Sequence, residues 1–363
     1  MSHRLQSIAL PPRSLGTARS LAVYRFGREG ARPKAYLQAA LHADELPGTL
    51  VLRQLCRLLD QGEVTGEVVV VPVANPVGAS QHLLGSHIGR FDLDTAVNFN
   101  RGYWDIGRDL EVDDPGDVAA VRRALLAAVA GLEPAHEAAA MKRALMGLAI
   151  DADVVLDLHC DSESLMHVFV NAAAWPAAED LTRQLGTPVV LLEEEAGGLP
   201  FDEAAALPWL RLAERFPGRA APCPVLAATV ELRGEADVSM ALAEADARAL
   251  FAFLQRRGIV AGDPGPLPAA RCAATPLTGV EYLHSPVPGV VNYLVEAGTP
   301  VARGQEVAEV YDPTAPWAAP LVLRAGTDGL LFARRAWRHA RPGETVAKIA
   351  GSTPLPGAKM LEA

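Results

Sequence analysis

Lysine is scarce in this sequence. Its 363 residues include only Lys34, Lys142, Lys348 and Lys359, and none of these follows a glycine. The phosphate-binding loop Gly-x-x-x-x-Gly-Lys-Ser/Thr is therefore absent. The Gly-x-Gly-x-x-Gly motif of dinucleotide-binding folds and the Gly-x-Ser-x-Gly motif of serine hydrolases are absent too. The absence of these motifs argues against an ATP-dependent enzyme, a dinucleotide-binding protein and a serine hydrolase of the common type.

Positive charge is also in the minority, because 43 acidic residues outweigh 33 Lys and Arg residues and give a net charge of −10. No basic run opposes this balance, which argues against a nucleic-acid partner. No apolar stretch reaches the length of a membrane span, and residues 1–21 lack the apolar core of a signal peptide. We therefore expect a cytoplasmic protein with no nucleic-acid or membrane partner.

Cysteine is limited to four scattered residues with no Cys-x-x-Cys pair. This usage favours reduced thiols over a disulfide framework or a structural zinc knot. Half of the residues are hydrophobic and 21% are charged, as in a globular protein with a good core. A length of 363 residues favours two domains over one.

Strand and helix patterns alternate over the first 260 residues. The apolar run at 36–41 is typical of a buried strand, Pro47 opens a helical pattern that extends to residue 60, and a second buried strand follows at 67–72. This order predicts an α/β domain over residues 1–260 with parallel neighbours in its sheet. Further helices are expected at 117–149 (broken near Pro134), 176–186, 203–215 and 239–257, and further strands at 20–26, 153–158, 166–170, 187–192 and 225–232.

The last third of the chain has a different character. Residues 261–278 are rich in proline and are interpreted as a linker. Residues 279–363 consist of short strand patterns separated by turns, with a weak internal repeat, and they predict a small all-β domain.

His42 and Glu45 stand between the first buried strand and the helix that follows it. A histidine at the end of a strand and a carboxylate at the mouth of the next helix can converge on one point, and both are good zinc ligands. His159 ends the strand pattern at 153–158. Because ligands bind beyond the carboxyl ends of strands in open α/β sheets, His159 is the expected third ligand of a catalytic zinc site.

Four short motifs occur in order along residues 36–257: His42-Ala-Asp-Glu45, Asn98-Phe-Asn-Arg101, Asp157-Leu-His159 and Glu231-Leu-Arg-Gly234. Together they resemble the succinylglutamate desuccinylase/aspartoacylase family, whose members are zinc hydrolases related in fold to the M14 zinc carboxypeptidases. The resemblance implies a zinc-carboxypeptidase-like mixed sheet flanked by helices.

The resemblance also implies a role for individual residues. One zinc ion per chain would be bound by His42, Glu45 and His159, and Glu231 would be the general base that acts on zinc-bound water. Asn100 and Arg101 would bind a carboxylate of the substrate, and Arg90 would polarise the scissile carbonyl. Two departures, Gly102-Tyr-Trp after the Asn-Arg pair and Cys160-Asp-Ser-Glu-Ser after the zinc histidine, leave the identity of the substrate open.

Other charged residues have two interpretations each. Arg233 lies two residues beyond Glu231, so on a regular strand it shares that face and lines the pocket, or it forms an ion pair with Glu231. Asp157 either orients a metal ligand or binds a neighbouring backbone group. The acidic run at 193–195 is a solvated loop or a site for a cationic amine.

The C-terminal domain resembles the barrel-sandwich fold of biotinyl and lipoyl domains. Such carriers display a lysine in the central hairpin, but the corresponding turn at 312–320 has none. A carrier function is therefore not expected, which leaves a lid or an oligomerisation surface.

These features predict a zinc-dependent amidohydrolase that removes the acyl group from a small N-acyl amino acid or N-acyl amine. Two alternatives remain. One is a zinc carboxypeptidase of the same fold, and the other is a binding or regulatory protein that has kept the fold without the chemistry. A homo-oligomer is compatible with the sequence.

Overall fold

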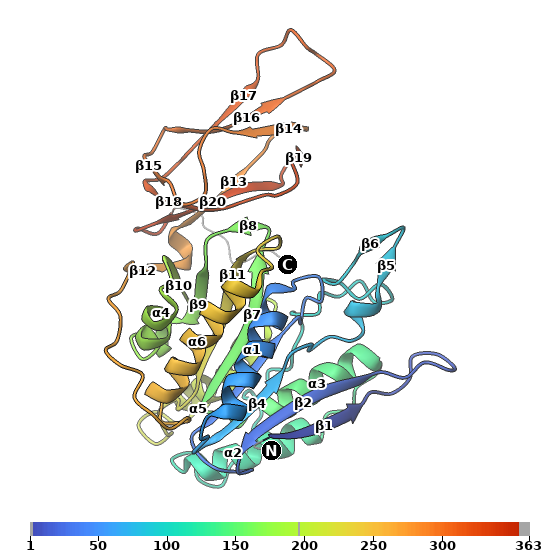
Figure 1. Cartoon of the computed structure of the whole chain (residues 1–363), viewed down its shortest axis with the longest axis vertical. Helices are drawn as coiled ribbons and strands as arrows, with labels where there is room; N and C mark the ends of the chain where they lie inside the picture. Colours follow the sequence, from blue (N-terminus) through green and yellow to red (C-terminus); the bar gives the residue numbers. More distant parts are fainter. Residues whose placement is uncertain (1–2, 195–196, 356–363) are drawn as a thin grey trace.

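The computed structural model describes residues 3–194 and 197–355 and consists of a large α/β part and a smaller all-β part (Figure 1). The α/β part is built on a nine-stranded sheet in the order β1-β2-β4-β3-β7-β11-β9-β10-β12. Its strands are β1 (His3–Ala9), β2 (Ser20–Gly27), β3 (Lys34–Ala39), β4 (Glu67–Val71), β7 (Val154–Asp161), β9 (His167–Asn171), β10 (Val189–Glu193), β11 (Leu226–Gly234) and β12 (Ala274–Pro276).

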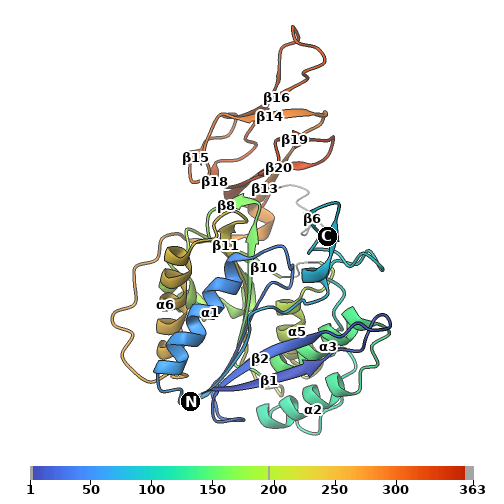
Figure 2. The same ribbon diagram turned by 45° about the vertical axis from the view of Figure 1, so that its right-hand side comes forward.

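Six helices cover the two faces of this sheet. They are α1 (Pro47–Gln61), α2 (Val118–Ala130), α3 (Glu137–Ala149), α4 (Glu179–Leu185), α5 (Phe201–Arg215) and α6 (Met240–Arg256). α1, α4 and α6 pack on one face and α2, α3 and α5 on the other, so the sheet lies between two layers of helices (Figure 1 and Figure 2). The sheet thus separates two hydrophobic cores. None of the helices in the described ranges combines the length and the apolar character needed to cross a lipid bilayer.

The predicted α/β architecture is confirmed at its centre. Strands β4, β3, β7 and β11 are mutually parallel, and β2 and β9 flank this group in antiparallel orientation, so the sheet is mixed. Pro47 begins α1 as predicted. The expected break in the long helical stretch falls between α2 and α3.

Two edge strands were not predicted. β1 pairs with β2 along its whole length, yet most of its side chains are exposed, so no apolar pattern marks it in the sequence. β12 lies within the segment interpreted as a linker and pairs in parallel with β10. The connection between the two parts of the molecule is therefore partly built into the main sheet.

The C-terminal part contains two small antiparallel sheets. One has the order β13-β20-β18-β15 and the other β17-β16-β14-β19. The strands are β13 (Val280–His284), β14 (Gly289–Tyr293), β15 (Pro300–Val301), β16 (Glu306–Tyr311), β17 (Leu321–Arg324), β18 (Gly329–Arg334), β19 (His339–Ala340) and β20 (Thr345–Gly351). Two further small clusters of apolar side chains fill its interior. The resemblance to biotinyl and lipoyl domains stays a prediction.

Short elements complete the chain. β8 (Glu163–Ser164) follows β7 directly, β5 (His82–Leu83) and β6 (Ser86–His87) form a small hairpin, and three 3-10 turns span Gly78–Ser80, Ala172–Ala174 and Leu277–Gly279. The long segment between β4 and α2 is otherwise irregular, as the sequence indicates, and contains the Asn98–Arg101 motif.

Candidate metal centre and active site

The predicted metal ligands meet at the carboxyl edge of the sheet. His42 follows β3, Glu45 lies just before α1, and His159 lies near the end of β7, which is parallel to β3. All three side chains are buried, and one ligand atom from each lies within 4.8 Å of the others. The prediction that the fold brings His159 to the other two residues is confirmed.

Both histidines turn Nδ1 toward the carboxylate of Glu45. His42 Nδ1 lies 2.8 Å from Glu45 Oε1, and His159 Nδ1 lies 2.7 Å from Glu45 Oε2. The backbone N–H of Cys160 donates to Oε2 as well, at 3.1 Å. Burial alone would raise the pKa of Glu45, but the two imidazoles lower it well below its usual value, so this side chain is an ionised carboxylate.

The contacts of His42 define which of its nitrogens carries the proton. Nε2 lies 2.8 Å from Asn98 Oδ1, and that oxygen also accepts the backbone N–H of Asn100 at 2.8 Å. Since an amide oxygen only accepts, Nε2 carries the hydrogen, which leaves the lone pair on Nδ1. Arg90 Nη1 donates toward this Nδ1 at 3.2 Å. Burial lowers the pKa of His42, consistent with a neutral imidazole.

His159 is held between two carboxylates. Its Nε2 lies 3.0 Å from Oδ2 of Asp157, a fully buried residue two positions earlier on the same strand. Burial opposes protonation of His159, but the charges of Asp157 and Glu45 outweigh it and raise its pKa well above the usual value. A carboxylate behind an imidazole fixes its orientation and increases its basicity as a ligand.

This donor set fits a divalent metal ion. Two imidazole Nδ1 atoms and one ionised carboxylate face each other, and the opposite nitrogen of each ring is held by another side chain. A cation, the guanidinium of Arg90, already lies on two of these donors and donates to Glu45 Oε1 at 2.9 Å. Two histidines and a carboxylate, with a position left for water or substrate, are a ligand set of catalytic zinc.

Glu231 lies beside the ligands on the neighbouring strand. β11 runs parallel to β7 with Glu231 in register with His159, and both side chains project from the sheet face that α5 covers. Glu231 Oε2 is buried and has no hydrogen-bond partner among the described residues. Burial, reinforced by the charge of Glu45, raises the pKa of Glu231 to about 8.

The loop at residues 98–101 lies against the same site. Asn100 Oδ1 accepts the backbone N–H of Phe201 at 2.9 Å, which directs its Nδ2 toward His159 Nε2 at 3.4 Å. Arg101 Nη1 donates to the backbone oxygen of Asn100 at 2.8 Å. The buried Nε of Arg101 has no hydrogen-bond partner within the ranges that the structure describes.

Two further residues, Asn98 and Lys142, contribute to the site in ways that the sequence does not predict. Asn98 belongs to a recognised motif, but only its contact with His42 reveals what it does. Lys142 on α3 is buried and donates to the backbone oxygens of Asn98 and Arg101. The isolated lysine in an apolar helical pattern was the only sign of this anchor in the sequence.

Arg90 reaches the centre because its loop packs tightly on the turn that carries the ligands. A Cβ atom on the preceding Gly89 would lie 2.2 Å from the backbone nitrogen of Asp44, so glycine is required there. Gly89 also donates its N–H to Asp44 Oδ2 at 3.1 Å. The Arg90 side chain is half exposed, so its guanidinium lies where buried ligands meet solvent.

Arg233 is not brought into this group. Its guanidinium pairs with Asp246 on α6, on the opposite face of the sheet from Glu231. The cause is a bulge in β11, where the register with β7 shifts after Glu231 and Arg233 takes a φ of 65°. The alternation that would place Arg233 on the face of Glu231 is interrupted, and an ion pair between the two is not formed.

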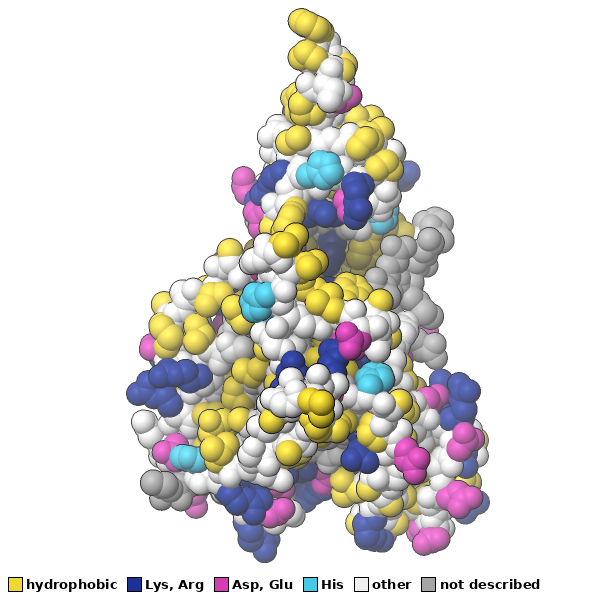
Figure 3. Space-filling model, turned by 90° about the vertical axis from the view of Figure 1, so that its right-hand side faces the viewer, with side chains coloured by type: hydrophobic (Ala, Val, Ile, Leu, Met, Phe, Trp, Pro, Cys, Tyr) yellow, Lys and Arg dark blue, Asp and Glu magenta, His cyan; other side chains and the backbone are white. Residues whose placement is uncertain are grey.

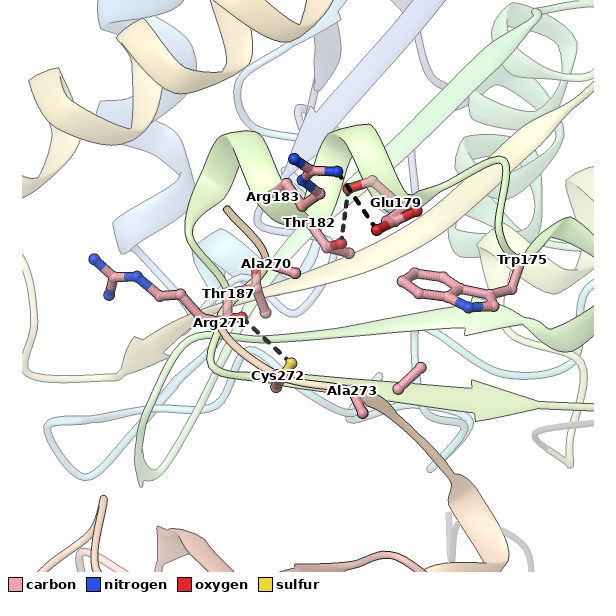
Figure 4. A pocket seen from close by; sticks show the side chains of 10 residues that line it. Trp175, Glu179, Thr182, Arg183, Thr187, Ala270, Arg271, Cys272 and Ala273 are labelled. Carbon is pink, nitrogen blue, oxygen red and sulfur yellow. Dashed lines mark hydrogen bonds and ion pairs between the residues drawn. The ribbon is translucent and has the colours of Figure 1, made fainter. Parts of the chain in front are cut away.

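The face that carries the β5–β6 hairpin shows basic side chains near its middle, below the C-terminal part (Figure 3). A separate cavity of about 290 Å³ lies between α4 and the segment that leads into β12 (Figure 4). Its lining includes Trp175, Arg183 and Cys272 but none of the triad residues.

The fold and the triad together define an α/β protein with three side chains that could hold a metal ion at the carboxyl edge of its sheet. A model of the succinylglutamate desuccinylase/aspartoacylase catalytic domain matches residues 31–257. The chain belongs to this family, which confirms the resemblance seen in its motifs.

Related proteins extend the match to nearly the whole chain. The N-alpha-acetyl-L-2,4-diaminobutyric acid deacetylase of Halomonas elongata is 28% identical over 344 residues, which are 89% of this chain and 83% of the relative. A family protein from Shewanella amazonensis is 30% identical with a TM-score of 0.83, covering 96% of this chain and 98% of that one. Another, from Shewanella frigidimarina, is 26% identical with a TM-score of 0.85 and covers 96% and 97%.

Proposed function

We propose that this chain is a zinc-dependent amidohydrolase of the cytoplasm that removes the acyl group from a small N-acyl amino acid or N-acyl amine. The observation that carries the proposal is the pairing of Glu231 with His159 in the sheet. It places a partly buried carboxylate without a hydrogen-bond partner for one oxygen beside three converging ligands. Family membership and the Halomonas elongata deacetylase support the same reaction class.

His42, Glu45 and His159 would hold one zinc ion per chain. When bound, zinc lowers the pKa of water toward ~7 and polarises a carbonyl oxygen. Asn98 and Asp157 would keep Nδ1 of each histidine directed inward through their contacts with Nε2.

Glu231 would act as the general base and then as the acid. It takes a proton from the water that attacks the amide carbon and delivers it to the nitrogen as the C–N bond breaks. The products are a free carboxylic acid and an amine. Its raised pKa places the carboxyl group near neutrality, where both directions of transfer are accessible. Arg90, at the exposed margin of the ligands, would stabilise negative charge on the carbonyl oxygen.

Arg101 would bind the carboxylate of the substrate. Its Nε–H has no hydrogen-bond partner in the described part of the chain, and Arg90 is a nearby like charge. Burial, followed by this like charge, lowers the pKa of Arg101, while the charges of Asp202, Glu193 and Glu203 oppose that shift. A guanidinium binds both oxygens of a carboxylate at once. Asn100 would assist from the same loop, and we leave Arg233 out of the substrate site.

The substrate class follows from these groups. A ligand with a carboxylate for Arg101 and an amide for the metal site is an N-acyl amino acid. N-alpha-acetyl-L-2,4-diaminobutyric acid, on which the Halomonas elongata relative acts, has this form. We include it among the compounds to be tested.

A hydrolysis screen tests the proposal. The full chain is dialysed against zinc, its metal content is measured, and it is offered N-acetyl, N-formyl and N-succinyl amino acids together with blocked dipeptides. We expect one zinc per chain and release of free amines from the N-acyl amino acids. Glu231→Gln should be inactive. Glu29→Gln, which alters an exposed carboxylate paired with Arg4, should match the wild type.

Each alternative has a distinct result. Cleavage of the blocked dipeptides alone would identify a carboxypeptidase. A chain that stays free of metal after dialysis and hydrolyses nothing would be a binding protein, and the proposal would be wrong.

A further inference from the structure

The segment that follows the strand of His159 pairs with the C-terminal part. β7 ends at Asp161, Ser162 turns the chain, and β8 then pairs with β18 in antiparallel register (Figure 1). The first sheet of the C-terminal part is thus hydrogen-bonded to the main body immediately after the metal ligand.

Charged and apolar contacts reinforce this junction. Glu163 forms ion pairs with Arg334 and Arg338. The Phe332 ring packs on the His167 ring with centroids 5.0 Å apart. Ser162 Oγ accepts the backbone N–H of Ala336 at 2.8 Å. The position of β18, and of β20 beside it, is therefore fixed relative to β7.

Lys348 extends from β20 across this junction. Its Nζ donates to Asp161 Oδ2, two residues beyond His159. Tyr282 on β13 and Ala333 on β18 stand opposite Lys348 on the two neighbouring strands. About a quarter of the side chain is exposed, at 27%, against 18% for Asp161. The pair is consequently sheltered from solvent.

Lys348 contributes a positive charge to a site with an excess of carboxylates. Glu45, Asp161 and Glu231 provide the negative charges that act on this region, and Glu235 lies near them. Arg90 and Lys348 are the arginine and lysine side chains whose positive charges oppose these carboxylates. Lys348 alone among these cations comes from outside the α/β part.

We propose that Lys348 is a positioning residue of the active site, delivered by the C-terminal part. Through its ion pair with Asp161 it holds the end of β7 and balances the charge around Glu231, so the site is complete only when the two parts are docked. Lys348 does not bind the metal and does not contact the substrate. The C-terminal part therefore has a direct function in the reaction.

The ion pair acts on Glu231 through electrostatics. Asp161 is opposite Gly234 in the β7–β11 ladder, next to the bulge that follows Glu231. Without Lys348, Asp161 would lose its ion pair with an ammonium group and would keep the backbone N–H of Ser162 and the His167 ring, whose Nε2 lies 4.0 Å away.

The experiment uses the full chain and three variants: Lys348→Met, Lys348→Arg and the double variant Lys348→Met/Asp161→Asn. Zinc content, thermal unfolding, kcat and KM are measured with an N-acyl amino acid that the wild type hydrolyses. Lys348→Met should keep its zinc and KM while kcat falls by about 10- to 100-fold, the usual effect of losing a supporting partner at a metal site. Lys348→Arg retains the charge and should recover most of kcat.

The double variant separates this role from simple loss of stability. Removing both charges together leaves no unpaired carboxylate, so its kcat should exceed that of Lys348→Met. An unchanged kcat in Lys348→Met would overturn the proposal. A raised KM with normal kcat would overturn it too and make Lys348 a substrate contact. If Lys348→Met does not fold, Lys348→Gln replaces it. This variant should also keep its zinc and KM while its kcat falls, and a normal kcat would overturn the proposal.

This inference rests on the proposed hydrolase function, and the two fail differently. A wild type without hydrolysis would reject the function. A wild type that hydrolyses, with variants at the same kcat, would reject only the role of Lys348.

Discussion

Each histidine of the candidate metal centre has a polar side chain at its Nε2, on the side of the ring away from Glu45. Asn98 lies 56 positions from His42 yet supplies the acceptor for its Nε2. Asp157 is only two positions from His159 and acts on it from the same strand. Because these contacts direct Nδ1 inward, the triad is ordered for a cation by the protein itself.

The base can be tested at a single residue. Glu231→Gln keeps the size of the side chain but cannot accept a proton. The variant should fold and retain zinc while kcat falls by roughly 10²–10⁴-fold, the usual contribution of a general base. A variant that loses zinc would make Glu231 a ligand, and one with near-normal kcat would require another base.

The protonation state of Glu231 predicts how activity changes with pH. Glu231 must be ionised to act, so kcat/KM should decline as the pH falls through its pKa, about 8 in the absence of a bound cation. A bound divalent cation favours the ionised form, so the decline should occur below pH 8 in the zinc-loaded enzyme. Residual activity of Glu231→Gln should lack this acid limb, and a limb that persists would belong to another group.

The contact between Asn98 and His42 gives a prediction on metal affinity. Asn98→Leu keeps a similar volume but removes the acceptor for Nε2–H, so the imidazole is no longer fixed in one tautomer and orientation. Zinc affinity should fall by about 10- to 100-fold, as measured by competition with a chelator. Asn292→Leu, on an exposed strand of the C-terminal part, is the matched control. Equal affinity in both variants would assign Asn98 to loop structure only.

At the scale of elements, the loop at 98–101 depends on a helix that does not otherwise reach the site. Lys142 projects from α3 and donates to two backbone oxygens of this loop. Burial lowers its pKa to about 8, only partly opposed by Asp92. The helix thus holds the loop with a cation that is costly to bury.

This cost predicts how stability changes with pH. The unfolded-state pKa of lysine is about 10.4, so between pH 8 and that value the unfolded chain binds more protons at Lys142 than the folded chain does. The free energy of unfolding should therefore rise with pH in this window through Lys142, and it should not rise in this way in Lys142→Met. Urea unfolding of both proteins at several pH values measures the difference between them. Two parallel curves would mean that Lys142 titrates normally.

The elements also explain which parts of the site could be predicted. Strand patterns that can be recognised in the sequence precede His42, Glu45 and His159. Because parallel strands end at the same edge of a sheet, the convergence of these three residues could be predicted. Arg233 was placed on the face of Glu231 by assuming regular alternation, which the bulge in β11 interrupts. A bulge is set by three-dimensional packing and has no clear signature in these residues.

The contribution of Lys348 was hidden for a different reason. Its strand belongs to the C-terminal part, which the sequence presents as a separate domain after a proline-rich linker. The pairing of β8 with β18 and the ion pair of Lys348 with Asp161 reveal that this part touches the end of β7. Contacts between distant segments through side chains are not encoded in local patterns.

At the scale of the whole molecule, the two parts share structure as well as a surface. β8, which follows β7, pairs with β18 of the C-terminal part, and β12, which precedes that part, pairs with β10 of the main sheet. Phe169, Val189 and Leu191 of the main sheet also pack with Val280 and Phe332 in one apolar cluster. The molecule should therefore unfold as a single cooperative unit, although the sequence predicts two domains.

Phe332→Ala tests this cooperativity. The ring is almost fully buried and lies on His167 and the shared cluster, so its removal should reduce the free energy of unfolding by about 3–5 kcal/mol, as large-to-small changes at buried aromatic residues do. Because the cluster joins both parts, urea should still unfold the variant in one transition, and kcat should fall as Lys348 loses its fixed position. Val301→Ala, within the apolar core of the C-terminal part, should weaken stability with little effect on kcat. Two separate transitions, with the α/β part unfolding at the wild-type urea concentration, would show instead that the parts are energetically independent and that the junction contributes nothing to the site.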